Sequence, residues 1–337
     1  MWSWLPGLVL LTLTLFRVAT SISAATEQRR MPTVFLMGSQ KGGSSSLYEI
    51  LIRHPGLCGA VYKEPNYFLT NAAAGRDLSW YLSLFKDPKC LKSPSKNFVD
   101  GSCMLHGLEA ALPVLNASYS SVQLQSLRFV VLLREPVARD FSWYKHRTRA
   151  HLSKGSNSTF AAIKTYGECF RSAEHNSSFH VPFAGRCHTR GNYAQQLKVF
   201  SRYFRREQIL VLNSGLLFNN SATLMPAISE FLGVRPSSLW APPFPRLDHV
   251  DASIKNPSCV LRWVPQLDCS TRDSLGAFYR GKNADLEKWL ADTQAQAPRS
   301  EPFFTPFGDA FKSVPCVEDA RAEYNKLTKR AKRLSCN

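Results

Sequence analysis

The sequence predicts an α/β domain in which helices cover both faces of a central, mainly parallel sheet. Residues 34–37 (VFLM) and 127–133 (LRFVVLL) are continuous apolar runs, which are typical of strands buried on both faces of a parallel sheet. Strand and helix patterns also alternate along the chain, as they do where parallel strands are joined by crossover helices. Together these observations indicate a layered α/β fold.

The other elements are expected from the spacing of apolar residues. Residues 47–53 read as the helix after the first strand. Pro136 suits the first turn of a helix that runs to about His151. Later elements are a helix over 193–204, a strand over 208–212, a helix over 225–232 and a helix over about 272–290. Residues 236–265 are rich in Pro and Ser and are expected to form an extended loop.

The N-terminus has the pattern of a secretory signal. Trp2 to Phe16 carries no charged residue, is shorter than the ~20 residues of a full membrane span, and is followed by Arg17 and a small-residue stretch. We therefore expect residues 1–25 to be a signal peptide or a short signal anchor, and not a helix of the folded domain. Residues 26–31 would be a linker, 32–295 the globular domain, and 296–337 a poorly patterned C-terminal extension.

The charge of the chain predicts an anionic partner. Lys and Arg outnumber Asp and Glu by 42 to 25, which gives a formal net charge of +17. Nucleic acid, a membrane surface or an acidic substrate could each match this charge. Entry into the secretory pathway disfavours nucleic acid. Four N-x-[ST] sequons agree with that entry, at Asn116, Asn157, Asn176 and Asn219.

The nine cysteines would mostly pair in an oxidising compartment. The pair expected first is Cys259 with Cys269, because it closes a small loop. Further candidate pairs are Cys169 with Cys187, Cys90 with Cys103, and Cys316 with Cys336. Cys58, beside an expected strand, would then be the odd thiol.

A glycine-rich loop, residues 38–46 (GSQKGGSSS), stands between the first strand and its helix. Strand, glycine-rich turn and helix form the arrangement that binds phosphate, because backbone N–H groups converge on the anion. Lys41 precedes the two glycines, whereas the ATP-binding loop G-x-x-x-x-G-K-[ST] has its lysine after them. This order indicates a phosphate-bearing donor other than ATP.

A second phosphate contact is expected where the strand over 127–133 ends. Arg134 follows this strand, and Ser142 lies about 9 Å along the helix that begins near Pro136. A guanidinium and a hydroxyl could hold one phosphate from two sides. A magnesium-binding strand would end in Asp instead. The one rival for that place, residues 98–100 (Phe-Val-Asp), has only a two-residue apolar approach. The alternative is that Arg134 and Arg139 only pair with Glu135 and Asp140.

These two motifs resemble those of the sulfotransferases that use 3′-phosphoadenosine 5′-phosphosulfate (PAPS). The loop from Lys41 to Ser46 is similar to their K-x-G-[TS] donor loop, and Arg134 with Ser142 to their R-x-P-x-x-R-x-x-S-x-Y motif. Among these enzymes, the luminal glycosaminoglycan group (heparan sulfate N- and 3-O-sulfotransferases and chondroitin enzymes) is the most similar. Further matches to that group, over residues 32–290, are His54-Pro55, Lys63 to Phe68, Trp80-Tyr81, Gly191 to Leu197 and Phe278-Tyr279-Arg280 with Asn283.

The resemblance implies a fold and a set of site residues. The fold would be a three-layer α/β/α domain like that of P-loop NTPases, and residues 32–295 would be the sulfotransferase domain. Glu64 would be the catalytic base, and Lys41 would neutralise the phosphosulfate. The donor would be bound by Lys41, Gly42, Gly43, Ser44, Ser45, Ser46, Arg134 and Ser142, without a metal. Alternatives are that Glu64 is a surface acid paired with Lys63, or that His106 or His146 is the base.

One stretch departs from the group's pattern. Several heparan enzymes carry Glu-Lys-[ST] on a second strand, whereas the corresponding residues 99–102 are Val-Asp-Gly-Ser. Asp100 would keep the acidic role, and Lys63 would compensate for the missing lysine.

The function that the resemblance implies is sulfuryl transfer from PAPS to a hydroxyl or amine of a carbohydrate, with acidic polysaccharides among the candidate acceptors. The expected location is the Golgi lumen, as a type II membrane protein held by its N-terminal anchor, or outside the cell if the signal is cleaved. The alternative functions are a P-loop kinase of a small metabolite and an inactive secreted protein that binds polyanions.

Overall fold

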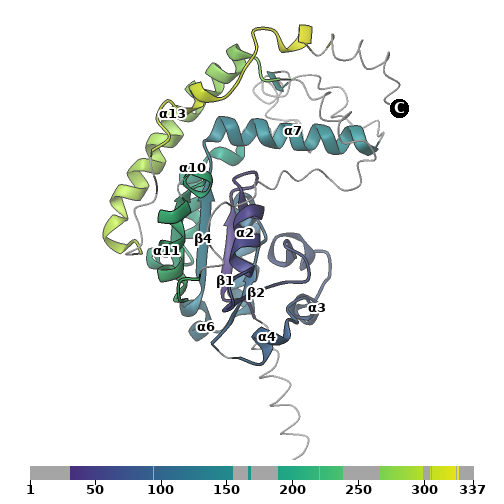
Figure 1. Ribbon diagram of the computed structural model, residues 1–337, viewed down its shortest axis with the longest axis vertical. Helices are drawn as coiled ribbons and strands as arrows, with labels where there is room; N and C mark the ends of the chain where they lie inside the picture. Colours follow the sequence, from purple (N-terminus) through teal and green to yellow (C-terminus); the bar gives the residue numbers. More distant parts are fainter. Residues whose placement is uncertain are drawn as a thin grey trace, which may run out of the picture.

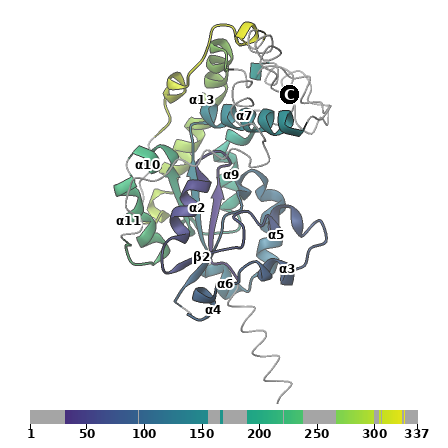
Figure 2. The ribbon, with the colours of Figure 1, turned by 45° about the vertical axis from the view of Figure 1, so that its right-hand side comes forward.

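The computed structural model describes residues 31–93, 95–154, 166–167, 189–219, 221–237, 266–298, 304, 306–323 and 325. These residues form a five-stranded sheet with helices on both faces (Figure 1, Figure 2). The strands are β1 Val34–Gly38, β2 Leu57–Gly59, β3 Asn97–Asp100, β4 Arg128–Leu133 and β5 Ile209–Asn213. Every neighbouring pair is parallel, so the predicted α/β fold class is confirmed.

Helices lie between successive strands and also after the last strand, β5. They are α2 Ser44–Ile52, α3 Leu78–Ser83, α4 Pro88–Leu91, α5 Leu108–Ser118, α6 Ser121–Ser126, α7 Pro136–Lys154, α9 Tyr193–Phe200, α10 Ser214–Asn219, α11 Ser221–Leu232 and α13 Cys269–Asp292. Within the described part of the chain, each helix is too short or too polar to span a bilayer.

The sheet order is β2-β3-β1-β4-β5. From β1 the chain builds the β2 and β3 side of the sheet, and from β4 it continues outward to β5 on the other side. The direction of winding therefore reverses between β1 and β4. In parallel α/β sheets, such a reversal opens a crevice at the carboxyl ends of the two strands, where ligands bind.

The core divides into two layers because successive side chains of a strand point to opposite faces. Phe35 and Met37 of β1 pack on one face with residues of α5 and α9. Val34 and Leu36 pack on the other face with residues of α2 and α11. The apolar runs that predicted the strands are thus buried on both faces.

A third apolar cluster lies beyond the carboxyl edge of the sheet, where α7 crosses above the strands (Figure 1). Val137, Phe141 and Tyr144 of α7 pack there against Leu275 and Tyr279 of α13. This packing brings α13, which is distant in sequence, next to the segment that follows β4.

The boundaries of the predicted elements differ from the structure in a few places. The helix expected over 47–53 begins at Ser44, and the helix expected over 193–204 ends at Phe200. The short strands β2 and β3 were indicated only beside Cys58 and at residues 98–100, without bounds, because a strand of three or four residues leaves too few alternations to set its ends. Residues 1–30, the sequons at Asn157 and Asn176, most of the expected loop over 236–265, and the pair Cys169 and Cys187 lie outside the described residues.

The predicted disulfide between Cys90 and Cys103 is wrong, as is the assignment of Cys58 as the odd thiol. Cys58 bonds Cys90, with Cα atoms 6.2 Å apart, and Cys103 is a free, buried thiol. Cys90 lies before β3 and Cys103 after it, so a four-residue strand (about 3.3 Å per residue) separates them. That separation exceeds the reach of a disulfide.

The predicted pairs Cys259 with Cys269 and Cys316 with Cys336 are also wrong. Cys269 bonds Cys316, with Cα atoms 5.0 Å apart. The backbone explains this partner: Cys269 N donates to the carbonyl oxygen of Val317 at 2.9 Å, so residues 316–317 lie beside the start of α13. Cys259 itself lies outside the described residues.

Peptide mapping without reduction should therefore recover Cys58 linked to Cys90 and Cys269 linked to Cys316. Replacing both Cys58 and Cys90 with Ala should lower the free energy of unfolding by about 3–4 kcal/mol, because the bond closes a long loop of the unfolded chain. Urea unfolding of this double variant measures the loss. A peptide that links Cys90 to Cys103 would contradict the structure.

Candidate active site

The glycine-rich loop lies at the carboxyl edge of the sheet, between β1 and α2. Its backbone departs from ordinary conformations at Lys41 (φ 68°) and Gly43 (φ 96°). Such left-handed residues among right-handed ones turn successive N–H groups toward one side, which makes an anion-binding concavity. The turn is closed by Gly42 N, which donates to the carbonyl oxygen of Ser39 at 2.9 Å.

The loop leads directly into the N-terminus of α2. Gly43 is the N-cap residue and has no side chain that could cap the first turn of the helix. Ser44 and Ser46 are buried in that turn, and Ser45 is half-buried between them. The helix dipole adds a partial positive charge here. The residues Lys41 to Ser46 thus form one unbroken stretch that runs from the turn into the first turn of α2.

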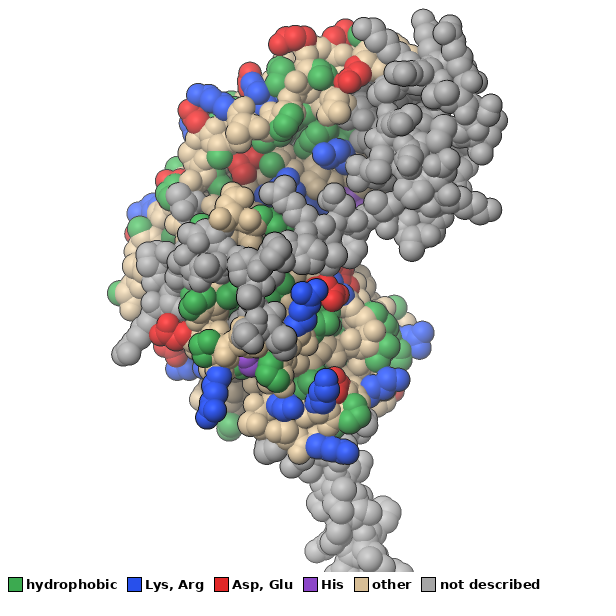
Figure 3. Space-filling model, viewed as in Figure 1, with side chains coloured by type: hydrophobic (Ala, Val, Ile, Leu, Met, Phe, Trp, Pro, Cys, Tyr) green, Lys and Arg blue, Asp and Glu red, His purple; other side chains and the backbone are tan. Residues whose placement is uncertain are grey.

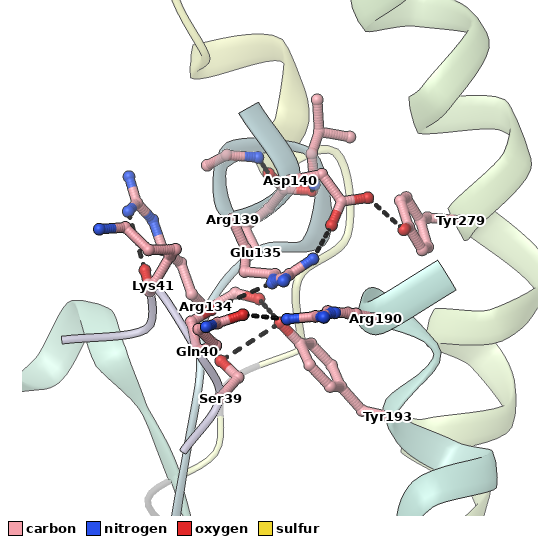
Figure 4. A network of polar contacts seen from close by, with 12 residues as sticks. Ser39, Gln40, Lys41, Arg134, Glu135, Arg139, Asp140, Arg190, Tyr193 and Tyr279 are labelled. Carbon is pink, nitrogen blue, oxygen red and sulfur yellow. Dashed lines mark hydrogen bonds and ion pairs between the residues drawn. The ribbon is translucent and has the colours of Figure 1, made fainter. Parts of the chain in front are cut away.

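Arginines from three elements hold this loop in place (Figure 4). Arg134, which follows β4, donates from Nη1 to the carbonyl oxygen of Lys41 at 3.1 Å. Arg139 of α7 donates from Nε to the carbonyl oxygen of Gln40 at 3.1 Å. Arg190, just before α9, donates to the side-chain oxygen of Gln40. The loop is thus fixed to β4, α7 and the α9 segment.

Arg139 belongs to a buried polar network beside the loop. Its Nη1 pairs with Asp140, and Asp140 also accepts a hydrogen bond from Tyr279 of α13. Arg139 and Asp140 have no exposed surface. Burial raises the pKa of Asp140 to about 6, although Arg139 opposes this shift. The pair expected between Arg139 and Asp140 is present, and it serves to hold Arg139 against the loop.

Glu135 has a different role from the pairing considered above. Its two carboxylate oxygens accept hydrogen bonds from Val137 N at 2.9 Å and Ala138 N at 2.7 Å. Glu135 therefore caps the N-terminus of α7, where a negative charge is favourable. Ser142 lies in the second turn of the same helix and is half-buried.

Glu64 approaches the start of α2 from the segment after β2. Its side chain is 40% exposed and pairs with Lys63, whose ammonium also donates to Ser44 Oγ at 3.3 Å. Cys103 Sγ lies 3.6 Å from Glu64 Oε1 and 3.0 Å from Ser44 Oγ. The structure thus brings Glu64 next to the donor loop, on a side open to solvent. The pairing of Glu64 with Lys63 was the alternative considered from the sequence, and it occurs inside the site.

The sequence did not predict the places of Cys103 and Arg190 in the site. Cys103 contacts the loop only because β3 lies beside β1. Predicting this contact would have required knowledge of the order of the strands in the sheet. Arg190 directly precedes Gly191 to Leu197, a stretch that matches the glycosaminoglycan group. This position in the sequence could have indicated that Arg190 lies in the site. Of the alternative bases, His106 lies on the 3-10 helix Met104–Gly107 and His146 on α7.

Comparisons with known proteins bear on the family and the fold of the chain. A family model described as "Sulfotransferase domain" matches residues 31–241. The human bifunctional heparan sulfate N-deacetylase/N-sulfotransferases 3 and 1 are 26% and 25% identical over 281 and 288 residues. Each match covers 77% of this chain and 30% of the relative, so the chain spans under a third of their length.

A solved structure shares the fold. The sulfotransferase from Alicyclobacillus acidocaldarius superposes with a TM-score of 0.55 at 21% sequence identity, over 77% of this chain and 96% of that one. At this identity the likeness bears on the fold alone.

Replacing Tyr279 with Phe should destabilise the protein by about 1–3 kcal/mol, because Asp140 stays buried and loses one of its donors. Urea unfolding measures the loss. Tyr203→Phe is the matched control, since Tyr203 is 40% exposed and its replacement should change stability by less than about 0.5 kcal/mol. Equal effects of the two substitutions would contradict the importance of the network.

Proposed function

Because the chain belongs to the sulfotransferase family, we propose that it transfers a sulfuryl group from PAPS to a hydroxyl or amine of a carbohydrate. One observation carries this proposal. The Lys41 loop, Arg134 and Glu64 come from three separate segments, and the fold brings them together at the carboxyl edge of the sheet, where winding reverses. Such an edge is where parallel α/β proteins bind nucleotides.

The donor would be held at its two phosphate ends. Gly43, Ser44, Ser45 and Ser46 would give backbone and hydroxyl hydrogen bonds to the 5′-phosphosulfate. Gly42, whose N–H closes the turn onto Ser39, would serve the donor by allowing the tight backbone of the loop. Arg134 and Ser142 would bind the 3′-phosphate. The left-handed backbone at Lys41 and Gly43, and the glycine N-cap of α2, fit this role because they leave N–H groups directed at an anion.

Glu64 would act as the base on the acceptor side. It accepts the proton of the acceptor hydroxyl or amine while that oxygen or nitrogen forms a bond to sulfur. The bond between sulfur and the 5′-phosphate oxygen breaks, and its electron pair leaves with the phosphate. Lys41 neutralises the charge that builds up there. The products are the sulfated acceptor and 3′-phosphoadenosine 5′-phosphate. The 40% exposure of Glu64 supports this role, because an acceptor can reach the carboxylate from solvent.

The acceptor that we propose is a glycosaminoglycan of the heparan sulfate class. The names of the relatives point to that polysaccharide. The net charge of +17 would favour an anionic chain. On the face shown in Figure 3, Lys and Arg side chains outnumber acidic ones over the lower half of the molecule, around α3 and α4.

We also propose that the protein works in the secretory pathway, in the Golgi lumen, with residues 1–25 as its signal or anchor. The disulfides Cys58–Cys90 and Cys269–Cys316 support an oxidising compartment, because such bonds are rare in the cytosol. A kinase of a small metabolite has less support. Of the two strands beside β1, β4 is followed by Arg134, and β3 ends in Asp100, whose buried carboxylate already accepts hydrogen bonds from Tyr81 and from Ser102 N.

Arg134→Ala should weaken binding of 3′-phosphoadenosine 5′-phosphate by about 10- to 100-fold, since a hydrogen bond to a charged group is lost. Binding of adenosine 5′-phosphate, which lacks the 3′-phosphate, should weaken less, because that nucleotide is affected only through the lost contact of Arg134 with the loop. Isothermal titration of both nucleotides measures the difference. An equal loss for both would show that Arg134 does not bind the 3′-phosphate.

Glu64→Gln should reduce sulfuryl transfer by about 100-fold or more, because the amide cannot accept the acceptor's proton. Its affinity for 3′-phosphoadenosine 5′-phosphate should stay within about threefold of the native value, since the donor loop is unchanged. Transfer of labelled sulfate to N-desulfated heparan sulfate, together with nucleotide titration, provides the test. A native protein that binds nucleotide and transfers nothing would support the inactive polyanion-binding alternative.

A further inference from the structure

Lys63 stands at the junction between the proposed base and the donor loop. Its ammonium pairs with Glu64, donates to Ser44 Oγ at 3.3 Å and lies 3.7 Å from Cys103 Sγ. The Lys63 side chain is 16% exposed, compared with 40% for Glu64. One cation therefore contacts the carboxylate and the first residue of α2 at the same time.

The stem of Lys63 fills space that the end of β3 leaves open. A Cβ atom on Gly101 would lie 2.8 Å from the carbonyl oxygen of Lys63, 2.9 Å from its Cγ and 2.7 Å from Cδ2 of Tyr48. No side chain at position 101 fits without moving the backbone. The cation beside Ser44 consequently comes from the segment that carries Glu64, and not from the strand beneath it.

The backbone of this segment is fixed to the buried end of β3. Asn66 N donates to Ser102 Oγ at 2.9 Å, and Ser102 N donates to Asp100 Oδ1 at 2.7 Å. Tyr81 donates to the other oxygen of Asp100 at 2.6 Å. Asp100 and Ser102 have no exposed surface. The backbone that carries Lys63 and Glu64 is thus held next to the buried end of β3, and the ammonium is placed by its contacts with Glu64 and Ser44.

Lys63 is also expected to keep its charge. Burial alone would lower the pKa of its ammonium, but the contacts with Cys103 and Glu64 outweigh this effect and raise the pKa above its usual value. An ammonium offers three N–H donors and no acceptor. It can therefore hold Glu64 and Ser44 together while it keeps a full positive charge.

We propose that Lys63 is a positioning residue for sulfuryl transfer, which holds Glu64 against the donor loop and supplies a fixed positive charge on the acceptor side. This inference rests on the proposed function, in which Glu64 is the base and residues 41–46 bind the donor. Lys41 and Lys63 would then serve different halves of the reaction: Lys41 the leaving phosphate, and Lys63 the carboxylate that receives the proton. If the pair of Lys63 and Glu64 had only a structural role, it would add little to the free energy of unfolding, because it is partly open to water.

The test measures transfer by Lys63→Ala, Lys63→Met and Lys63→Arg, with labelled PAPS and N-desulfated heparan sulfate. We expect kcat to fall by about 100-fold in the Ala and Met variants and by about tenfold or less in the Arg variant, which keeps the charge. The affinity for 3′-phosphoadenosine 5′-phosphate and the Tm should change little. Hydrolysis of PAPS, with water as the acceptor, gives a second rate that needs no glycan, and we expect the same order among the variants.

Chemical rescue separates a charge from a merely structural contact. Ethylammonium chloride should restore activity of the Ala variant by about tenfold in a saturable manner, because the small cation can enter the space of the lost ammonium. Acetamide, or sodium chloride at the same ionic strength, should not restore it. Lys288→Ala is the matched control, because Lys288 forms an exposed pair with Asp292 at 3.3 Å and its loss should leave the rate unchanged.

Native rates in the Ala and Met variants, or losses that follow the Tm and are not rescued by ethylammonium, would overturn the inference. Glu64→Gln distinguishes this failure from that of the proposed function. If Glu64→Gln is inactive and the Lys63 variants are active, only the role of Lys63 is wrong. If Glu64→Gln is active, the base assignment fails, and the role of Lys63 fails with it.

Discussion

The site depends on the parallel pairing of β1 with both β3 and β4. Because parallel strands end at the same edge, the segments that follow these three strands have to meet there. The segment after β1 is the glycine-rich loop, the segment after β4 begins with Arg134, and the segment after β3 contains Cys103. The contacts of the loop with Arg134 on one side and Cys103 on the other follow from this adjacency. Lys63, which follows β2, reaches the loop because β2 pairs with β3 in turn.

The buried pair of Arg139 and Asp140 shows what such a site requires beneath its surface. A buried ion pair adds little net stability, because desolvation offsets the attraction between the charges. Here the pair orients Arg139 toward the carbonyl oxygen of Gln40, and Tyr279 of α13 donates to the same carboxylate. The conformation of the loop is thereby coupled to the packing of α7 on α13. The main effect of the network is to fix the position of Arg139, and its contribution to the free energy of unfolding is smaller.

The sequence predicted those features that are local, or that follow from strand ends. The buried strands, the loop at Lys41 and the position of Arg134 after β4 could be predicted, because each depends on one continuous stretch of sequence. Membership of the sulfotransferase family is confirmed.

The disulfides could not be predicted, because Cys58 meets Cys90 and Cys269 meets Cys316 through packing between segments that are distant in sequence. The contacts of Cys103 could not be predicted because they depend on the order of the strands in the sheet, which no single stretch of the sequence contains. The catalytic roles of Glu64 and Lys41 remain predictions from resemblance.

The most direct test of the central claim is transfer of labelled sulfate by the purified protein. Labelled PAPS would be incubated with N-desulfated heparan sulfate, O-desulfated heparan sulfate and desulfated chondroitin, with γ-labelled ATP as the competing donor. The account predicts that label moves from PAPS to at least one glycan, with one equivalent of 3′-phosphoadenosine 5′-phosphate formed for each sulfate transferred. Phosphate transfer from ATP, or nucleotide binding without transfer to any of these glycans, would contradict it.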